Sequence, residues 1–424
     1  MDASKLKILL VNHSDSRGGA AVVSRRLMEA LCASGADARM LVVHKDGDSP
    51  RIDRPAGKLK LALPFLAEHA DIFRCNGFDR GTLFRISTGA FGTSLLRHPW
   101  FEKADAVILN WVNQGMLSLR QIESIARQKP VVWVMHDMWN LTGVCHYTEG
   151  CTGYTSGCAH CPLVPKSSLA AKVFARKKRL YENSSIHFVA VSHRLEQMCR
   201  RSPLMEKAPI TVIPNPFPLS RFPVEPALSR KDLGLPESQK LIVMGAARLD
   251  DPVKNLPLAI EALNLLDRSD ATPVFYGNLR NPEILRDLRA NHLWTGPIHN
   301  EKHLQSLMAH ADVVLSTSVW ETLPGTLIEG ISCGAAAAAT SNGGQSDIVD
   351  PGITGYLIPT PADSPNGPQN PSPHEVARAI DSALKLPQDA ESRKKRHALM
   401  AAKFDSRAVA ARYLKLIDHL VTHR

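Results

Sequence analysis

The chain of 424 residues is 44% hydrophobic and carries a formal net charge of +10. It is too long for one ordinary hydrophobic core and fits two domains of about 200 residues each. The opening MDASKLKILLVNHS lacks the apolar core of a signal peptide, and no apolar run approaches the roughly 18 residues of a membrane-spanning helix. We therefore expect a soluble, cytoplasmic protein.

The excess of positive over negative charge lies entirely in the first half of the sequence. Residues 1–220 contain 29 Lys and Arg against 18 Asp and Glu, whereas residues 221–424 contain 22 against 23. A basic half favours an anionic partner, such as a lipid carrier in an anionic membrane or a nucleic acid. A surface whose charge only keeps the protein soluble is the alternative interpretation.

Short apolar runs ended by polar residues alternate with helical patterns in this first half. The runs occupy residues 7–12, 38–44, 104–111 and 130–135. Buried parallel strands have this composition. The alternation of strands and helices predicts a doubly wound α/β sheet, which binds ligands at the carboxyl ends of its strands.

Two of these strand ends carry candidate site residues. Gly18 and Gly19 follow the first run and precede a helix, where glycine lets the backbone approach a phosphate or a sugar closely. His136 follows the fourth run, and its imidazole can hydrogen-bond a sugar hydroxyl or a departing phosphate, with Asp137 able to bias its charge state. A plain turn and a loop histidine satisfied by its own chain are the respective alternatives.

Two further segments of the first half are candidate surface elements. Residues 58–97 mix apolar, aromatic and basic residues, which predicts either a buried pair of helices or helices that line an acceptor cleft or touch a membrane. Residues 166–181 form a helix with five basic residues between Lys172 and Arg179. This helix can attract an anionic membrane or a lipid diphosphate acceptor, or it can present a solvated face.

Four of the eight cysteines lie within the short segment CHYTEGCTGYTSGCAHC, as Cys145, Cys151, Cys158 and Cys161. In a cytosolic protein disulfides are rare, so clustered thiols that include a Cys-x-x-Cys pair favour tetrahedral zinc. Four cysteine ligands leave no open coordination position, and such a zinc is therefore expected to be structural. A disulfide-linked or redox-active loop and unliganded thiols are the alternatives.

The second half begins with another apolar strand, KLIVMGAARL, which two cations follow. Arg248 and Lys254 stand at a junction between this strand and a helix. There they can neutralise a diphosphate leaving group in the transition state. Ordinary surface charges are the alternative.

The stretch from residue 319 to residue 347 holds two carboxylates around a glycine. Glu321 is expected in a loop between a strand and a helix, and Glu329 about one turn into that helix. The N–H groups of residues 325–327 then stand at the helix N-terminus, where unpaired donors and the helix dipole favour an anion. Ionised glutamates accept hydrogen bonds from vicinal hydroxyls. The pattern predicts a ligand in which a sugar is joined to a phosphate.

These motifs resemble those of the family 4 glycosyltransferases, which are retaining enzymes of the GT-B fold that use nucleotide sugars. Glu321 and Glu329 match the family's E-x7-E signature, and Arg248 and Lys254 match its Arg-x5-Lys pair. The segment from His136 through the Cys-rich loop resembles a subgroup typified by colanic-acid and capsular-polysaccharide glycosyltransferases.

The chain departs from the family pattern at three positions. Gly330 stands where Ala is common, and Asn255 stands where Gly usually follows the Lys of the Arg-x5-Lys pair. Gly343 and Gly344 resemble the start of the family's Gly-Gly-x-x-Glu loop, with Asp347 in place of Glu.

The resemblance implies a role for each candidate residue. Gly18 and Gly19 would lie against the donor diphosphate, Arg248 and Lys254 would stabilise its departure, and His136 would be the active-site histidine. Glu329 would hold ribose hydroxyls. The residues expected to hold the hexose are Glu321, Leu323, Pro324, Gly325 and Thr326. The acceptor hydroxyl would attack from the face that the diphosphate leaves, without a metal ion in catalysis.

The same resemblance and the proline-rich stretch after residue 213 predict the domain boundaries. We expect an acceptor-side Rossmann-like domain at 1–215 with a Cys-rich insertion at 145–161, a linker at 216–235, a nucleotide-sugar-binding Rossmann-like domain at 236–400, and a C-terminal helix at 401–424 that crosses back to the first domain. The two doubly wound domains would face each other across a cleft.

We therefore expect a hexosyltransferase of surface polysaccharide biosynthesis, with a nucleotide diphosphate sugar as donor and a glycan or lipid-linked molecule as acceptor. Peripheral attachment to the inner face of an anionic plasma membrane fits the basic first half. Alternatives are a nucleotide-sugar epimerase or a glycan phosphorylase on the same scaffold, and a zinc-dependent nucleic-acid-binding protein. The last is disfavoured, and no nucleic-acid partner is expected, because the Cys-rich loop has no adjoining basic recognition helix.

Overall fold

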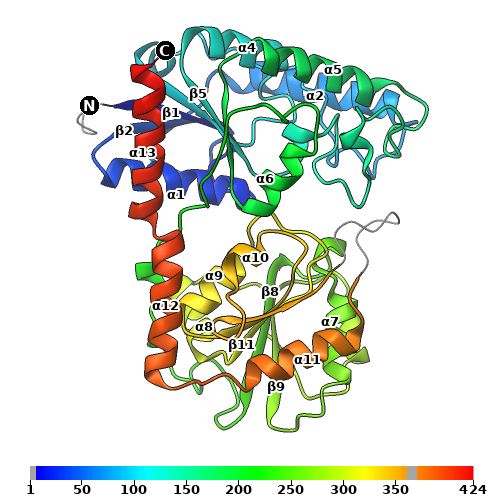
Figure 1. Ribbon diagram of the computed structural model, residues 1–424, viewed down its shortest axis with the longest axis vertical. Helices are drawn as coiled ribbons and strands as arrows, with labels where there is room; N and C mark the ends of the chain where they lie inside the picture. Colours follow the sequence, from blue (N-terminus) through cyan, green and yellow to red (C-terminus); the bar gives the residue numbers. More distant parts are fainter. Residues whose placement is uncertain (1–5, 361–369, 424) are drawn as a thin grey trace. The chain divides into compact units, whose positions relative to one another are not determined.

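Wholly apolar strands alternate with helices along the chain, and this alternation folds into two units. The computed structural model describes residues 6–360 and 370–423. Unit 1 comprises residues 1–217 and 406–424, and unit 2 comprises residues 218–405. Helices cover both faces of the sheet in each unit (Figure 1).

Unit 1 is built on a parallel sheet with the strand order β3-β2-β1-β4-β5-β6-β7. Its strands are β1 (Lys7–Ser14), β2 (Asp37–His44), β3 (Ile52–Asp53), β4 (Ala106–Leu109), β5 (Val131–Met135), β6 (His187–Ala190) and β7 (Ile210–Val212). Its helices are α1 (Gly19–Ala33), α2 (Lys58–Cys75), α3 (Pro99–Lys103), α4 (Leu119–Gln128), α5 (Leu169–Glu182), α6 (His193–Arg200) and α13 (Ser406–Thr422). The last of these packs on α1, so helices from near the start and near the end of the sequence belong to the same unit.

Unit 2 is built on a second parallel sheet with the order β10-β9-β8-β11-β12-β13. Its strands are β8 (Lys240–Arg248), β9 (Ala271–Asn278), β10 (Leu293–Trp294), β11 (Val313–Ser316), β12 (Ala336–Thr340) and β13 (Gly355–Ile358). Its helices are α7 (Leu256–Asn264), α8 (Glu301–His310), α9 (Gly325–Ser332), α10 (Gln345–Ile348), α11 (Pro373–Leu384) and α12 (Ala390–Phe404).

Both sheets are doubly wound, which confirms the predicted fold class. The strand order reverses between β1 and β4 in unit 1 and between β8 and β11 in unit 2. In open parallel sheets a ligand binds outside the carboxyl ends of the strands at this reversal. The loops after these four strands are therefore where a site is expected.

Local signals in the sequence set where several helices begin. In α4 the side chain of Ser118 accepts the N–H of Gln121, and the side chain of Gln121 accepts the N–H of Ser118. Ser372 and Glu375 form the same reciprocal pair at α11. Each pair satisfies two helix donors that would otherwise lack partners. No helix in the described part of the chain is long and apolar enough to cross a membrane.

The basic residues of helix α5 do not all face solvent, although a solvated basic face was one interpretation of its sequence. Four of its five basic residues are exposed, but Lys177 is fully buried. Its ammonium group donates to the carbonyl oxygens of Thr142 (3.1 Å) and Gly143 (3.0 Å) and also to that of Trp139, whose ring centroid lies 3.5 Å away. Lys177 therefore ties α5 to the start of the Cys-rich loop rather than facing solvent.

Replacing this lysine should destabilise unit 1. Lys177→Met leaves three buried carbonyl groups without a donor, and we expect a loss of about 2–4 kcal/mol in the free energy of unfolding. Lys178→Met is the matched control, because Lys178 is exposed and makes only a long surface ion pair with Glu182 (3.9 Å). Thermal unfolding of the two variants measures the difference, and equal melting temperatures would show that the buried contacts contribute little.

Candidate functional site

The site predicted in unit 2 lies at the reversal of its sheet. Lys254 follows β8, in the short 3-10 turn Pro252–Lys254, and Glu321 lies in the loop after β11. Their side chains form an ion pair, although 67 positions separate them in the sequence. The hydroxyl of Ser318 also donates to Oε1 of Glu321 (3.1 Å). The side chains of Lys254 and Glu321 are 29% and 19% exposed, so the charged pair remains accessible.

Hydrogen bonds tie the two loops together behind this ion pair. The hydroxyl of Thr317 donates to the carbonyl oxygens of Lys254 (2.9 Å) and Asn255 (3.1 Å), and the N–H of Val319 donates to that of Val253 (2.8 Å). Asn255 has φ +53°. This left-handed conformation explains why Gly is usual here and why Asn, which tolerates it better than most residues, replaces Gly.

The glycine pair after β12 packs directly on the Glu321 loop. The N–H of Gly344 donates to the carbonyl oxygen of Glu321 (2.9 Å). A Cβ atom on Gly343 would lie 1.9 Å from that same oxygen, and one on Gly344 would lie 2.2 Å from the carbonyl oxygen of Thr322. Only glycine permits this approach, so the pair fixes the backbone that carries Glu321.

Helix α9 begins beside these loops, as the sequence predicts. Its first residue is Gly325, it follows Pro324, and it has no side-chain cap at its N-terminus. Glu329 lies just over one turn into the helix and is partly buried. A Cβ atom on Gly330 would lie 2.2 Å from Cγ1 of Val314 in β11. Glycine at position 330, in place of the usual Ala, therefore lets α9 pack closely against the sheet.

Four polar side-chain atoms around this site are buried without a hydrogen-bond partner in the described part of the chain. They are Nδ2 of Asn255, the hydroxyl of Tyr276, Nε1 of Trp320 and Oε1 of Gln345. Burial, and after it the charge of Glu329, raise the pKa of Tyr276 well above its ordinary value, so this hydroxyl stays protonated. Buried polar groups without partners are rare in folded proteins, and a bound ligand is one explanation for such a cluster. No sequence motif predicted that these four residues belong to a site.

Arg248 does not join the pair formed by Lys254 and Glu321. Its guanidinium pairs with Asp250 (3.3 Å), and its side chain is 44% exposed. The structure thus brings together one of the two predicted cations and one of the two predicted glutamates. Arg248 stands at the end of the same strand, β8.

In unit 1 the predicted residue His136 lies at the carboxyl end of β5. Its Nε2 donates to Oδ1 of Asn110, which follows β4 at the reversal of the sheet (3.0 Å). Burial lowers the pKa of His136 to about 4, so the imidazole is neutral near pH 7.

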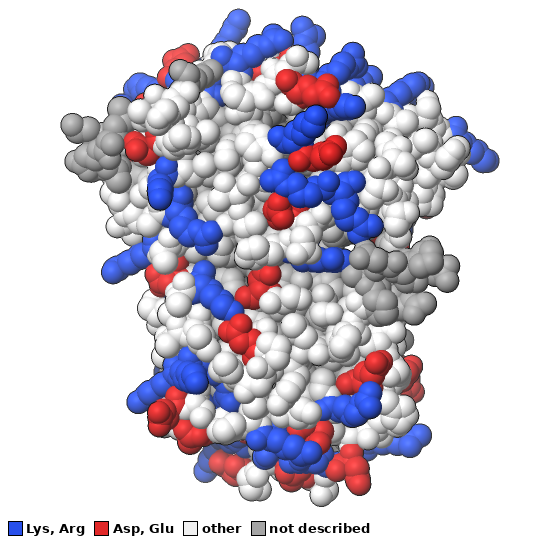
Figure 2. Space-filling view, viewed as in Figure 1, with Lys and Arg blue, Asp and Glu red and all other residues white. Residues whose placement is uncertain are grey.

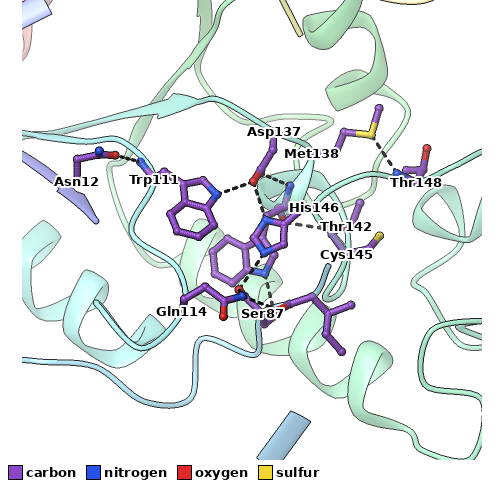
Figure 3. Close-up of polar contacts among 12 residues, drawn as sticks. Asn12, Ser87, Trp111, Gln114, Asp137, Met138, Thr142, Cys145, His146 and Thr148 are labelled. Carbon is purple, nitrogen blue, oxygen red and sulfur yellow. Dashed lines mark hydrogen bonds and ion pairs between the residues drawn. The ribbon is translucent and has the colours of Figure 1, made fainter. Parts of the chain in front are cut away.

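The neighbouring carboxylate of Asp137 has partners other than His136 (Figure 3). It accepts from Nε1 of Trp111 (2.8 Å), the N–H of Trp139 (2.8 Å) and Nδ1 of His146 (2.6 Å). Burial alone would raise the pKa of Asp137, but these donors, His146 foremost, bring it below its ordinary value. Asp137 raises the pKa of His136, as expected, but burial outweighs this effect. Through His146, Asp137 also joins the strand end to the Cys-rich loop.

His146 extends this network into the interior of unit 1. Its Nε2 lies 2.9 Å from the hydroxyl of Ser87, which also accepts from the side-chain amide of Gln114 (3.1 Å). His146 and Ser87 are buried. The Asp–His–Ser arrangement therefore has no exposed nucleophile and serves to position the segments that it connects.

The glycine pair after β1 forms the start of α1. Gly18 has φ +86° and precedes the helix, and Gly19 is its first residue, without a side-chain cap. Positive φ explains the need for glycine at Gly18. A Cβ atom on either residue would meet no atom of the described residues within 4 Å. These residues therefore leave room for a ligand beside the helix N-terminus.

The four cysteines of the Cys-rich loop line one cavity of about 280 Å³. Backbone N–H groups donate to the sulfur atoms of Cys151 (3.4 Å) and Cys158 (3.2 Å), whereas burial raises the pKa of the Cys145 thiol to about 12. All eight cysteines are free thiols, and no group of three or more His, Cys, Asp or Glu among residues 6–360 and 370–423 is arranged to hold a metal ion. As placed, these residues do not fit a zinc site, so no chemistry is assigned to zinc. The predicted structural zinc stays a prediction that elemental analysis tests.

Two family descriptions match most of the chain. Residues 18–216 match the glycosyl transferase 4-like domain, and residues 227–400 match glycosyl transferases group 1. The putative colanic acid biosynthesis glycosyl transferase WcaC of Escherichia coli (strain K12) is 34% identical over 79 residues, which is 17% of this chain and 19% of that relative.

Solved structures share the fold over almost the whole chain. Sucrose-phosphate synthase of Thermosynechococcus elongatus superposes with a TM-score of 0.67 at 19% identity, covering 99% of this chain and 100% of the other. HepE of Anabaena in complex with UDP and glucose superposes with a TM-score of 0.62 at 16% identity, covering 98% and 100%. These likenesses confirm the GT-B fold expected from the sequence.

The buried histidines of unit 1 predict a loss of stability in acid. Burial lowers the pKa values of His13 and His136 to about 4, from an ordinary value of 6.5. Between these values the unfolded chain binds protons that the folded chain does not, so stability is present above pH 6.5 and falls as the pH drops. We expect each histidine to cost about 2 kcal/mol between pH 7 and pH 5.

Denaturant unfolding at these two pH values measures the effect. His136→Gln should remove about 2 kcal/mol of the wild-type difference, whereas the exposed His374→Gln should leave it unchanged. An undiminished difference in His136→Gln would show that His136 titrates alike in the folded and unfolded chains.

Proposed function

Because the chain belongs to the family 4 glycosyltransferases, we propose that it moves a hexose, with retention, from a nucleotide diphosphate sugar to a hydroxyl of a glycan or lipid-linked acceptor. The observation that carries this proposal is the ion pair of Lys254 and Glu321 at the reversal of the unit 2 sheet. Nearby loops and strands carry buried polar atoms that have no hydrogen-bond partner among the described residues. A sugar diphosphate offers both the anion and the hydroxyl groups that such a site lacks.

Unit 2 contains groups suited to bind each part of the donor. The ammonium of Lys254 and the uncapped N-terminus of α9 attract the diphosphate, because both present positive charge or unpaired N–H donors. Glu329 and the hydroxyl of Tyr276 suit the ribose, and Glu321 with residues 323–326 suits the hexose. Arg248 at the end of β8 adds a cation that can exchange Asp250 for phosphate oxygens.

The reaction then needs no carboxylate nucleophile. The bond between the anomeric carbon and the diphosphate oxygen breaks, and the acceptor oxygen forms its bond to that carbon on the same face. The acceptor proton passes to the departing phosphate. Lys254 stabilises the charge that develops on this leaving group, which is the role that a metal ion takes in other transferases. In unit 1, His136 is neutral and suited to hydrogen-bond a sugar hydroxyl.

The comparisons suggest a setting and a first donor to test. WcaC is described as a protein of colanic acid biosynthesis, and HepE binds UDP and glucose. We accordingly propose a role in capsule or exopolysaccharide synthesis and UDP-hexoses as the first candidate donors. Action at the cytoplasmic face of the plasma membrane, as a peripheral protein, fits the basic first half of the sequence.

Substitution of the central pair should abolish most of the turnover. Lys254→Ala removes the cation beside the leaving group, and Glu321→Gln removes the charge that orients Lys254. We expect each to lower kcat by about 100- to 1,000-fold, the usual effect of losing one group that stabilises the transition state. Transfer from a radiolabelled UDP-hexose to acceptor in membrane extract measures this.

Two exposed residues of α8 serve as matched controls for these substitutions. Lys302→Ala and Glu301→Gln change the same residue types in unit 2, outside the proposed donor site, and should keep wild-type turnover. Wild-type turnover in Lys254→Ala, with a confirmed substrate and normal folding, would contradict the proposed site.

A further inference from the structure

A cavity of about 490 Å³ lies in unit 1, outside the candidate residues described above. It lies between the turn after β1, the end of β2 with its following loop, and the first two turns of α2. Four cations line it: Arg17, Lys45, Arg54 and Lys58. The one carboxylate in the lining is that of Asp46.

Part of this positive charge is not neutralised within the described part of the chain. Arg17 makes a two-point contact with Asp46 (2.9 and 3.0 Å), and Arg54 donates to two backbone carbonyl oxygens (2.9 and 3.3 Å). By contrast, the ammonium groups of Lys45 and Lys58 have no ion-pair or hydrogen-bond partner among residues 6–360 and 370–423. Two unpaired ammonium groups in one concave site favour an anion with several acceptor oxygens, such as a phosphate or a diphosphate. Figure 2 shows how Lys and Arg alternate with Asp and Glu on one face of the molecule, where charges of both signs are mixed.

The cavity continues onto an apolar stripe of α2. Leu61 and Phe65 line the cavity itself. Leu59, Leu63 and Leu66 recur at intervals of four and three residues, so they form the adjacent row on the same helix. They are 75%, 59% and 60% exposed, respectively. An anion-binding cavity thus borders a surface that favours an apolar chain.

Contacts on the other side of α2 hold this stripe outward. Glu68 is buried, and its two carboxylate oxygens accept the N–H groups of Thr88 (2.9 Å) and Gly115 (2.9 Å). Turning the leucines inward would break both bonds and leave a buried carboxyl without partners, which is costly. The exposure of the stripe is therefore imposed by the fold.

Two buried histidines, His13 and His69, stand behind residues that line the cavity. Nδ1 of His13 and Nε2 of His69 are buried without hydrogen-bond partners in the described part of the chain. The ring of His13 lies 5.0 Å from that of His44, and the ring of His69 lies 4.0 Å from that of Phe65. Both His44 and Phe65 line the cavity. The imidazole of His44, which lines the cavity, is therefore the ring that can hydrogen-bond a sugar hydroxyl.

We propose that this cavity binds the phosphate or diphosphate of a lipid-linked acceptor and that the leucine stripe of α2 contacts its apolar chain. The proposal rests on the glycosyltransferase function proposed above and names the class of its acceptor. Lys45 and Lys58 bind the anion, and Leu59, Leu63 and Leu66 cover the first part of the chain. The sugar attached to the phosphate then lies toward His44 at the end of β2.

Binding to lipid vesicles tests this proposal with the full-length protein. The probe is phosphatidylcholine vesicles that contain a small fraction of polyprenyl phosphate, compared with vesicles of equal surface charge made with phosphatidylglycerol. We expect the wild-type protein to bind the polyprenyl phosphate vesicles at least about tenfold more tightly. The double variant Lys45→Ala/Lys58→Ala should lose this preference, because one charge-assisted hydrogen bond accounts for about a tenfold change in affinity.

Matched variants of α2 separate the site from general attraction. Lys60→Ala removes an exposed lysine of the same helix that does not line the cavity and should bind as the wild type does. The triple variant Leu59→Ser/Leu63→Ser/Leu66→Ser should weaken vesicle binding about tenfold or more through lost apolar contact. Circular dichroism confirms that each variant is folded.

Equal binding to both kinds of vesicle would overturn the proposal in favour of a general membrane contact. An equal loss in Lys60→Ala and in Lys45→Ala/Lys58→Ala would overturn it as well, as would an absence of binding to polyprenyl phosphate. Thermal shifts with UDP-, GDP- and ADP-sugars, measured on the same proteins, report separately on the donor site in unit 2. A donor shift without vesicle binding contradicts only the acceptor proposal, and vesicle binding without any donor shift contradicts the transferase function.

Discussion

The ion pair between Lys254 and Glu321 depends on the way that a doubly wound sheet brings distant loops together. Each side chain stands just beyond the carboxyl end of a strand, and β8 and β11 are neighbours only because the strand order reverses between them. The pair is supported from behind by backbone contacts to Thr317 and Gly344. A buried or half-buried charge needs such fixed partners, so the loops that hold the pair are also the loops that shape the donor site.

The departures from the family pattern show how sequence and backbone are linked in unit 2. Asn255 adopts the left-handed conformation that glycine would otherwise supply, and Gly330 makes room for Val314. From the sequence alone each position counted against the resemblance. In the structure each satisfies a local steric requirement. The same reasoning identifies Gly343 and Gly344 as residues required by close backbone contact.

Much of the fold could be predicted because fully buried parallel strands have a plain signature, as in β1 and β5. Other parts could not. The alanines of β12 have no strand signature, since alanine favours helices and only burial in the sheet decides their conformation. The spacing of Arg248 and Lys254 also predicted that both cations act at one diphosphate, whereas the guanidinium of Arg248 contacts Asp250. The buried partners of Lys177, Asp137 and Glu68 depend on contacts between distant segments, which residue spacing does not contain.

The central claim is that unit 2 binds a sugar diphosphate around Lys254. A crystal structure of the protein with bound UDP tests it most directly. We predict that a diphosphate oxygen lies within hydrogen-bond distance of Nζ of Lys254, that the ribose contacts Glu329, and that at least one of the unpartnered atoms of Asn255, Tyr276, Trp320 and Gln345 gains a partner. UDP bound elsewhere, with the ion pair of Lys254 and Glu321 unchanged, would contradict the account.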